Sequence, residues 1–466
     1  MNSKLVSLFC CLIMLVSFSG CTKVTQLVKD NQPTKAELLA EINEEHQRWE
    51  AAPAADPTPY LRHYDDPADA QKYFDYVTDI YSEYDAAKEL SLEEAEEDVN
   101  YLFDAFYYDF AFYDYFGGHT VFDQAKAEIL QELQAKDSLT CKDLQEVLVK
   151  HLTFIKDGHF NINHNFPAEK EIPFFFRQVM FVKTDSGYQN ANGKVVASVD
   201  DHPDLDELFK RSISEQGYLV YYPVLLKPAP FDGTEWEKHT CDETLTVHYT
   251  DGSTDTLTAD AWRQYYKELP KDQNTDLRQT DGIPVFQFNS FDGSFLQEVN
   301  AAAAQMSDAA ISMLDLRSNV GGYEEVAHQW ITRYSRQRVQ GNGVRYDVVN
   351  PVSVAIQAHR WQTHDNILIL LSGKCSASSA EITMDLAYNL ENSLIIGENT
   401  NGCMIGNGGH VELPNSKCSV IMTSVCVYLL PEGADYFEEM RGLSPDIWVP
   451  AGEAETLAAK LMENLK

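Results

Sequence analysis

The sequence has little positive charge. Across 466 residues, 36 Lys and Arg stand against 72 Asp and Glu, which gives a formal net charge of −36. Such a surface repels phosphate backbones, so we expect no nucleic-acid partner. After the first 20 residues, the sequence also lacks any apolar run long enough to predict a membrane-spanning helix. It contains no internal repeat and no low-complexity tract.

Cysteines are few and have no metal-binding spacing. The chain has nine, and those that follow residue 21 match no zinc pattern. We therefore expect neither a structural metal nor a disulfide framework. Apolar sequence, by contrast, is plentiful. Hydrophobic residues make up 44% of the chain, which at this length is enough for two to four domains with cores of their own.

The amino terminus has the features of a targeting segment. Lys4 precedes the apolar stretch LVSLFCCLIMLV, and the Ser-Gly-Cys that ends at Cys21 is similar to a bacterial lipobox. We expect residues 1–20 to be a lipoprotein signal peptide and Cys21 to carry lipid, which anchors a chain without spanning the membrane. The protein would then lie in the bacterial cell envelope, outside the cytoplasm. The alternative is an ordinary secretory signal followed by a chance cysteine.

Changes of pattern divide the rest of the chain into four regions. Residues 21–60 are polar and contain prolines, which indicates a tether with one short helix. Residues 61–165 are helical, and their aromatic segment YLFDAFYYDFAFYDYF is interpreted as core, with a cofactor or glycan platform as the alternative. Residues 166–275 contain Asn-Gly and Asp-Gly turns and predict a β-rich insert. Residues 276–466 alternate strand and helix, which predicts an α/β domain with largely parallel pairing.

Three motifs of the last region carry chemistry. LDLRSNVGG ends an apolar strand with Gly321 and Gly322, whose N–H groups can approach an anion closely. SGKCSASSAE joins a strand to a helix, so Ser378 and Ser379 would lie at a positive helix N-terminus that favours a developing oxyanion. FEEMRGLSPDIWVP places Glu439 before a glycine turn. Taken singly, each has an ordinary explanation as a turn, a helix cap or a solvated acid.

Together, and in this order, the motifs resemble those of the carboxyl-terminal processing and tricorn-like serine peptidases. That family has D-L-R-x-N-x-G-G, then (S/T)-A-S-x-x-E, then G-E-x-T-x-G and a late G-(V/L)-x-P-D. The matching segments here are 315–322, 376–381, 397–402 and 442–446. The resemblance implies a multidomain α/β protein whose catalytic domain is a crotonase-like β-α spiral. It also implies a PDZ module at 166–275, where a degenerate PDZ-like insert and an unrelated β insert stay open.

The resemblance implies a nucleophile and one missing residue. The nucleophile is the serine three residues before the glutamate of the second motif, which is Ser378, with Ser376 and Ser379 as rivals. One branch of the family uses a lysine after G-E-x-T-x-G, and this sequence has Cys403 there. Lys374 lies too close to the turn to replace that lysine.

The tricorn-like branch implies the other two catalytic residues. It takes a histidine from the helical region and a glutamate just before the last motif. These are His159, in the segment Asp-Gly-His, and Glu439. His119 is the competing histidine and Glu438 the competing glutamate.

These residues imply a serine-type peptidase that acts on a peptide or protein substrate. Ser378 would attack the carbonyl, neutral His159 would accept its proton, and Glu439 would orient the imidazole. Backbone N–H groups of Gly321 or Gly322 and of Ser379 would hold the oxyanion. No metal or organic cofactor is expected. Two alternatives remain: a catalytically inactive surface binding lipoprotein on the same fold, and an esterase with the same triad.

Overall fold

The computed structural model describes residues 26–465, apart from residues 51, 54, 232–237, 271, 350–360 and 425. The expected signal peptide at 1–20 and the lipidation site Cys21 lie outside the described residues. None of the helices in the described ranges is both long enough and apolar enough to cross a membrane.

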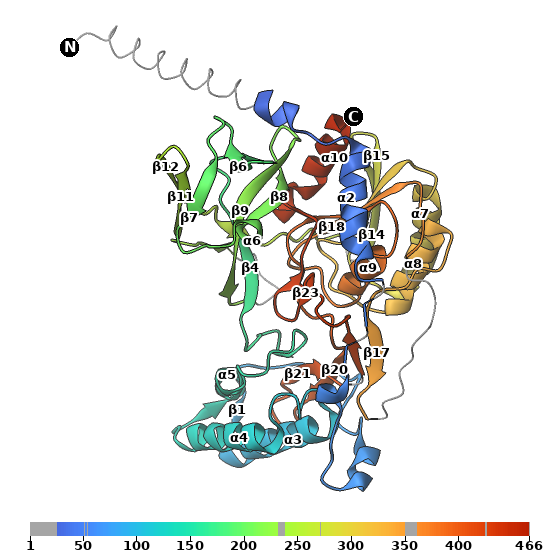
Figure 1. Cartoon of the computed structure of the whole chain (residues 1–466). Helices are drawn as coiled ribbons and strands as arrows, with labels where there is room; N and C mark the ends of the chain where they lie inside the picture. Colours follow the sequence, from blue (N-terminus) through green and yellow to red (C-terminus); the bar gives the residue numbers. More distant parts are fainter. Residues whose placement is uncertain are drawn as a thin grey trace, which may run out of the picture.

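A six-stranded sheet organises the carboxyl-terminal region (Figure 1). In spatial order its strands are β14 (Thr275–Thr280), β15 (Ile283–Phe288), β16 (Ile311–Asp315), β18 (Ile367–Ser372), β19 (Ser393–Gly397) and β25 (Ile447–Trp448). The pairs from β15 to β25 are parallel, whereas β14 joins β15 in antiparallel register. The predicted α/β region with largely parallel pairing is confirmed. The crotonase-like spiral stays a prediction.

Helices bury both faces of this sheet. Leu368 and Leu370 of β18 face a core shared with α7 (Leu296–Met306), α8 (Glu324–Ser335) and α9 (Ser379–Ala387). Ile369 and Leu371 face the opposite core, which includes α10 (Ala454–Asn464). Successive strand residues point to opposite faces, so a strand covered on both sides has a continuous apolar sequence. This explains the uninterrupted ILILL run before the serine-rich turn.

Among the residues described, the β-rich region contains two larger sheets and a two-stranded pair, β10 (Lys238–His239) with β13 (Trp262–Arg263). The first has the order β4 (Lys170–Phe175), β9 (Leu219–Ala229), β5 (Phe181–Thr184) and β6 (Gly187–Asn190), and β8 (Phe209–Ile213) pairs with β9. The second has the order β12 (Thr254–Thr258), β11 (Thr244–Tyr249) and β7 (Val196–Val199). The turn between β11 and β12 contains the Asp-Gly pair that predicted a hairpin. The likeness to a PDZ module stays a prediction.

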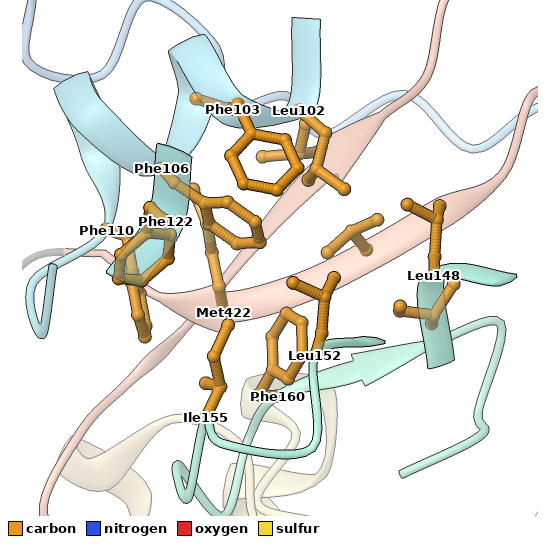
Figure 2. Close-up of a cluster of buried hydrophobic side chains, with 14 of the residues drawn as sticks. Leu102, Phe103, Phe106, Phe110, Phe122, Leu148, Leu152, Ile155, Phe160 and Met422 are labelled. Carbon is orange, nitrogen blue, oxygen red and sulfur yellow. The ribbon is translucent and has the colours of Figure 1, made fainter. Parts of the chain in front are cut away.

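The helical region consists mainly of α3 (Leu92–Asp109), α4 (Gly118–Gln134) and α5 (Cys141–His151). A capping box formed by Ser91 and Glu94 begins α3. Figure 2 shows Phe103, Phe106 and Phe110 in a packed core with Met422 of β21 (Ser419–Thr423). The aromatic segment is therefore core, as interpreted from its sequence. Since β20 (Gly408–Glu412) and β21 supply part of this core, the helical region is built onto strands from the end of the chain.

Part of the segment expected as a tether is packed against the α/β region. Helix α2 (Lys35–Gln47) buries Leu38 and Ile42 in the core that contains α10. Its His46 Nε2 lies 2.8 Å from Asp446 Oδ1. Residues 38, 42 and 46 are spaced by four, so they form one buried stripe on the helix.

The remaining short elements join these regions. They are η1 (Thr58–Tyr60), η2 (Pro67–Lys72), β1 (Glu89–Leu90), β2 (Leu139–Thr140), β3 (Asn161–Ile162), α6 (Leu205–Leu208), β10 (Lys238–His239), β13 (Trp262–Arg263), η3 (Gly293–Phe295), β17 (Val344–Asp347), β22 (Cys426–Leu429), β23 (Phe437–Glu438), β24 (Gly442–Leu443) and η4 (Ala451–Glu453). Strand β3 pairs with β21, which brings the end of the helical region to the carboxyl-terminal strands.

Candidate active site

Ser378 lies on the sharp turn between β18 and α9. Its backbone has φ +55° and ψ −116°, a conformation that residues with a side chain rarely adopt. Such strain persists only where the surroundings enforce it, and it is concentrated at functional sites.

The two rival serines have hydroxyl groups engaged in the structure of the turn. Ser376 Oγ donates to Leu316 O at 2.8 Å, and Ser379 Oγ donates to Gly322 O at 2.7 Å. Within the described residues, the Ser378 hydroxyl donates to no carbonyl. Of the three serines, Ser378 is therefore the one whose hydroxyl is available for chemistry.

Glu381 organises the backbone around Ser378. Its buried carboxylate accepts the N–H of Ser378 at 3.0 Å and the N–H of Cys403 at 3.0 Å on one oxygen. The other oxygen accepts the N–H of Gly402 at 2.7 Å and the hydroxyl of Thr400. The motif glutamate thus ties the serine turn to the end of the G-E-x-T-x-G segment. The sequence motif uses Glu381 only to identify Ser378 as the nucleophile. It does not predict that the Glu381 carboxylate holds the backbone of the turn.

The two glycines after β16 lie against the serine turn. Gly321 has φ +95°, and a Cβ there would lie 2.9 Å from both Ser378 Cβ and Ala377 O. Gly322 has φ +132°, and a Cβ there would lie 2.7 Å from Phe291 O. Neither position has room for a side chain, and each backbone conformation favours glycine. The structure therefore brings the predicted glycine loop and the predicted nucleophile together.

The N–H groups of this loop differ in availability. The N–H of Gly321 donates to Asn319 Oδ1 at 2.8 Å, so it is already engaged. Gly322 is exposed. The facing backbone of Phe291 bonds to the residues on either side of Gly322, because Tyr323 N–H donates to Phe291 O and Phe291 N–H donates to Gly321 O. Among the described residues, these bonds leave the N–H of Gly322 available. The N–H of Ser379 is in the first turn of α9, where a helix offers no internal acceptor. Gly322 and Ser379 are therefore better placed than Gly321 to donate to an oxyanion.

The turn that carries His159 is packed against the same segment. Buried Asp157 accepts the N–H of Thr423 and the N–H of His159, each at 3.0 Å. A Cβ on Gly158 would lie only 1.9 Å from the carbonyl oxygen of Gly402, so only glycine allows this approach. The helical region thus delivers His159 to the backbone that Glu381 joins to Ser378.

The imidazole of His159 is nearly enclosed. Its side chain is 12% exposed, and Nδ1 lies 3.9 Å from Asp157 Oδ1. Neither ring nitrogen has a hydrogen-bond partner in the part of the chain that is described, so no bond joins the ring to Ser378 or Glu439. Burial lowers the pKa of His159, and the nearby Asp157 opposes this effect only partly. The ring is therefore neutral at neutral pH.

Glu439 contacts the histidine turn through the backbone. Its Oε1 accepts the N–H of Gly158 at 2.8 Å, and its Oε2 accepts the N–H of Ile405 at 3.3 Å. Burial and the nearby Asp157 raise the pKa of Glu439 well above its usual range. The competing Glu438 is exposed and pairs with Arg441 at 3.0 Å. Glu439 is thus the glutamate that reaches the turn, although it does not touch the imidazole.

The other candidate base residues lie in different surroundings. His119 is half exposed and pairs with Asp65 at 3.1 Å in the helical region. Lys374 Nζ donates to Thr400 O at 2.7 Å and to Arg441 O at 2.9 Å. Burial lowers the pKa of Lys374 to about 7.

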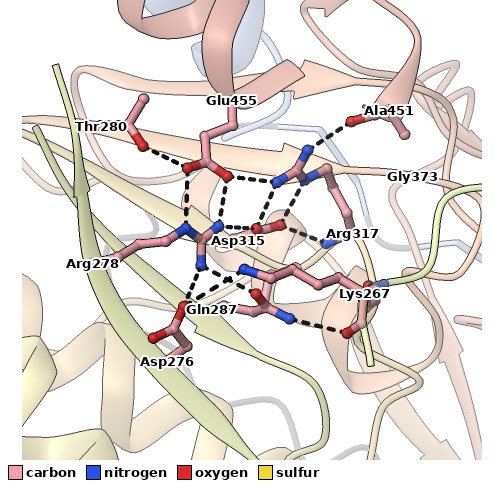
Figure 3. Close-up of polar contacts among 12 residues, drawn as sticks. Lys267, Asp276, Arg278, Thr280, Gln287, Asp315, Arg317, Gly373, Ala451 and Glu455 are labelled. Carbon is pink, nitrogen blue, oxygen red and sulfur yellow. Dashed lines mark hydrogen bonds and ion pairs between the residues drawn. The ribbon is translucent and has the colours of Figure 1, made fainter. Parts of the chain in front are cut away.

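Asp315 and Arg317 of the first motif form a buried ion-pair network at the end of β16, where the glycine loop begins (Figure 3). Arg317 donates to both Asp315 oxygens, at 2.8 and 2.7 Å, and to Glu455 of α10 at 2.8 Å. Arg278 of β14 donates to the same two carboxylates. Although burial opposes it, this pair of arginines holds the pKa of Asp315 below its usual range. The network fixes the strand end from which the glycine loop departs.

The described residues contain no group of three or more His, Cys, Asp and Glu side chains that could hold a metal ion. All six cysteines in these ranges are free thiols.

A free serine hydroxyl at a helix N-terminus, beside a glycine loop, is the arrangement of a serine hydrolase. Residues 282–449 match the model of peptidase family S41. The chain therefore contains a domain that matches this family and is a serine peptidase.

Solved structures of peptidases are similar to the chain at low sequence identity. Mature CPAF is 12% identical, with a TM-score of 0.40, and the match covers 80% of this chain and 96% of that one. The photosystem II D1 C-terminal processing protease is 14% identical, with a TM-score of 0.36 and coverage of 77% and 93%. A peptidase from Parabacteroides merdae is 17% identical, with a TM-score of 0.37 and coverage of 78% and 90%. No curated protein matches the chain.

Proposed function

We propose that this peptidase cleaves peptide or protein substrates through an acyl-enzyme formed on Ser378. The observation that carries the proposal is the strained Ser378 turn, whose free hydroxyl lies against the glycine loop inside the region that matches family S41. The enclosed His159 supports the proposal because a general base must be neutral before the reaction.

In the proposed reaction, Ser378 Oγ attacks the substrate carbonyl while His159 takes the hydroxyl proton. The N–H groups of Gly322 and Ser379 hold the oxyanion, and each such donor contributes ~3 kcal/mol of transition-state stabilisation. The C–N bond then breaks as the imidazolium returns the proton to the leaving amine. Water, deprotonated by His159, finally releases the acid and restores the serine.

Glu439 has an indirect part in this proposal. Its carboxyl group holds the Gly158 N–H and so helps to fix the turn, while the carboxylate nearest to the imidazole is that of Asp157. For catalysis the ring turns toward Ser378, and Asp157 and Glu381 supply the negative surroundings in which an imidazolium is tolerated.

A fluorophosphonate probe tests the nucleophile. We expect the purified protein to be labelled at Ser378 and Ser378→Ala to lose both labelling and peptide hydrolysis. Ser379→Ala is the matched control: it keeps labelling, because Ser379 is proposed to contribute its N–H and not its hydroxyl. Labelling that persists in a folded Ser378→Ala protein would show that another residue is the nucleophile.

One observation favours a second candidate, an inactive binding lipoprotein: the His159 ring has no hydrogen bond to Ser378. In that case the folded protein takes up no probe. An esterase is the third candidate, and it would label at Ser378 and hydrolyse activated esters but no peptide.

We further propose that Cys21 is lipidated and anchors the chain to a membrane of the bacterial cell envelope. The support is the lipobox-like sequence at 19–21. Cys21→Ser should abolish incorporation of labelled palmitate and move the protein from the membrane fraction to the soluble fraction. Cys241→Ser is the control and should leave both unchanged. A Cys21→Ser protein that still takes up palmitate would refute the anchor.

A further inference from the structure

Lys170, the first residue of β4, carries a buried ammonium group with an unusual set of partners. The residue is fully buried, and its Nζ donates to Gly158 O at 2.9 Å and to the side-chain oxygen of Asn401. It lies 4.7 Å from the ring centroid of Phe166. Within the described residues, Lys170 forms no ion pair with a carboxylate. A buried ammonium is costly, so a site that keeps one uses its charge or its hydrogen bonds.

These hydrogen bonds act on the residue that precedes His159. Lys170 holds the carbonyl of Gly158, while Glu439 holds the N–H of the same residue at 2.8 Å. The carbonyl of Gly402 also packs closely against Gly158, because a Cβ on Gly158 would lie 1.9 Å from the Gly402 oxygen. Gly158 is therefore held from three directions.

The backbone beside Lys170 is itself firmly attached. Glu171 donates its N–H to Met440 O at 3.1 Å, and its carboxylate accepts Arg441 Nε at 2.6 Å. Asn399 Nδ2 donates to Glu171 O at 2.9 Å. The start of β4 is thus joined to both the segment around Glu439 and the segment after β19. These contacts fix the position of the backbone that carries Lys170.

We propose that Lys170, a residue of the β-rich region, is a positioning residue of the active site. It holds the Gly158 carbonyl and thereby fixes the turn that presents His159 to Ser378. This inference rests on the proposed peptidase mechanism and adds a fourth side chain to it. It also gives the β-rich region a direct part in the chemistry.

The charge of Lys170 gives the proposal a measurable consequence. The titratable groups around the turn are Asp157 of the turn itself, Glu381 of α9, Glu439 before β24 and Lys170 of β4. Asp157 and Glu381 favour the imidazolium, whereas burial and Lys170 lower the pKa of His159. Removing this cation therefore raises the pKa of His159 and moves the acidic limb of activity to higher pH.

The experiment compares Lys170→Met with Lys374→Met across pH. Lys374 is a matched control, because it is also a buried lysine near Ser378 but bonds to Thr400 O and Arg441 O instead of the histidine turn. We expect Lys170→Met to lower kcat about tenfold with little change in KM, and to move the acidic limb of kcat/KM up by about half to one pH unit. In Lys374→Met the limb should stay at its wild-type pH.

A second variant covers the case in which Lys170→Met fails to fold. Asn401→Asp keeps the size of the side chain that accepts from Lys170 and places a negative charge beside the ammonium. It should also raise the pKa of His159 and move the limb upward. A direct measurement does not depend on activity: the His159 resonance of 13C-labelled histidine, identified by its loss in His159→Gln, can be titrated in each protein.

The outcomes separate the two proposals. If the wild-type protein neither takes up the fluorophosphonate nor hydrolyses peptides, the proposed function fails, while the titration still tests whether Lys170 controls His159. If the wild type is active but Lys170→Met and Asn401→Asp leave both the limb and the His159 titration unchanged, the role of Lys170 is refuted. A shift of equal size in Lys374→Met would refute it as well.

Discussion

At the scale of single residues, the environment of Ser378 depends on the buried carboxylate of Glu381. A serine hydroxyl has no special reactivity of its own, so its geometry must be supplied by neighbours. Glu381 accepts the N–H groups of Ser378, Gly402 and Cys403, and these charge-assisted bonds hold the turn in its strained conformation. The glutamate of the motif is therefore a positioning residue as well as a sequence landmark.

Replacing this carboxylate by an amide should damage both stability and catalysis. In Glu381→Gln, the new NH2 group faces backbone N–H donors, so the free energy of unfolding should fall by about 3 kcal/mol. We expect kcat to fall at least about tenfold as the Ser378 turn relaxes. Glu325→Gln on the exposed face of α8 is the control. Thermal unfolding and peptide hydrolysis measure the two effects, and a fully active Glu381→Gln enzyme would contradict this role.

The burial of His159 predicts the pH dependence of the reaction. Burial lowers the pKa of His159 in the folded protein, so the ring becomes protonated at a lower pH than an ordinary histidine, whose pKa is about 6.5. The acidic limb of kcat/KM should therefore have its midpoint below pH ~6.5. Because the unfolded chain binds this proton more readily, the same group also lowers stability as pH falls through that range. A midpoint above the usual value would mean that the imidazole is not the titrating base.

At the scale of elements, the loop after β16 and the N-terminus of α9 act as one unit. Ser379 Oγ donates to Gly322 O, and Ala377 N–H donates to Asn319 O, so the loop and the turn are joined on both sides of Ser378. The buried Asp315–Arg317 pair fixes the strand end beneath them. The N–H groups proposed to hold the oxyanion are thus fixed by the fold itself, and donors that are positioned before a substrate binds stabilise a transition state most effectively.

A methyl group in this loop should abolish most activity. In Gly321→Ala, the new Cβ meets Ser378 and Ala377 at 2.9 Å, so we expect kcat/KM to fall about a hundredfold or more. Gly282→Ala is the matched control, because Gly282 also has a positive φ but has no atom within 4 Å of its added Cβ. Both variants should lose about 1 kcal/mol of stability from backbone strain, and Gly321→Ala should lose more because its Cβ also meets Ser378 and Ala377. If both retain full activity, the close approach of the loop to Ser378 has no catalytic role.

At the scale of the whole molecule, distant parts of the chain are built into one another. Figure 1 shows α3, α4 and α5 at the end of the molecule opposite α10, together with β20 and β21. The site itself draws on the helical region for His159, on the β-rich region for Lys170 and on the α/β region for Ser378. No single region contains the proposed machinery.

The amino-terminal helix is also part of the folded body. Ile42 of α2 is fully buried against the α/β core, so Ile42→Ala should lower the free energy of unfolding by about 3 kcal/mol. Glu44→Ala, on the exposed side of the same helix, should change it by less than about 0.5 kcal/mol. Denaturant unfolding measures both. Equal, small effects would indicate that α2 is a free tether after all.

The sequence could predict much of the fold because the relevant information is local. The alternating strands and helices, the capping box at Ser91 and the aromatic core of α3 follow from periodicity and short-range hydrogen bonds. The tether was the exception. Leu38, Ile42 and His46 of α2 are spaced by four within a polar segment. This short pattern does not predict burial by itself, because the surface that buries it belongs to the distant α/β region.

The sequence by itself determined the order of the motifs, the serine at a helix N-terminus and the glycines of its loop, because each of these is a property of a short segment. Only the tertiary structure decided that Gly321 uses its N–H on Asn319, that Glu439 meets Gly158 and that Lys170 holds the histidine turn. Such contacts join residues far apart in the chain. They depend on how the three regions pack, and no local pattern encodes them.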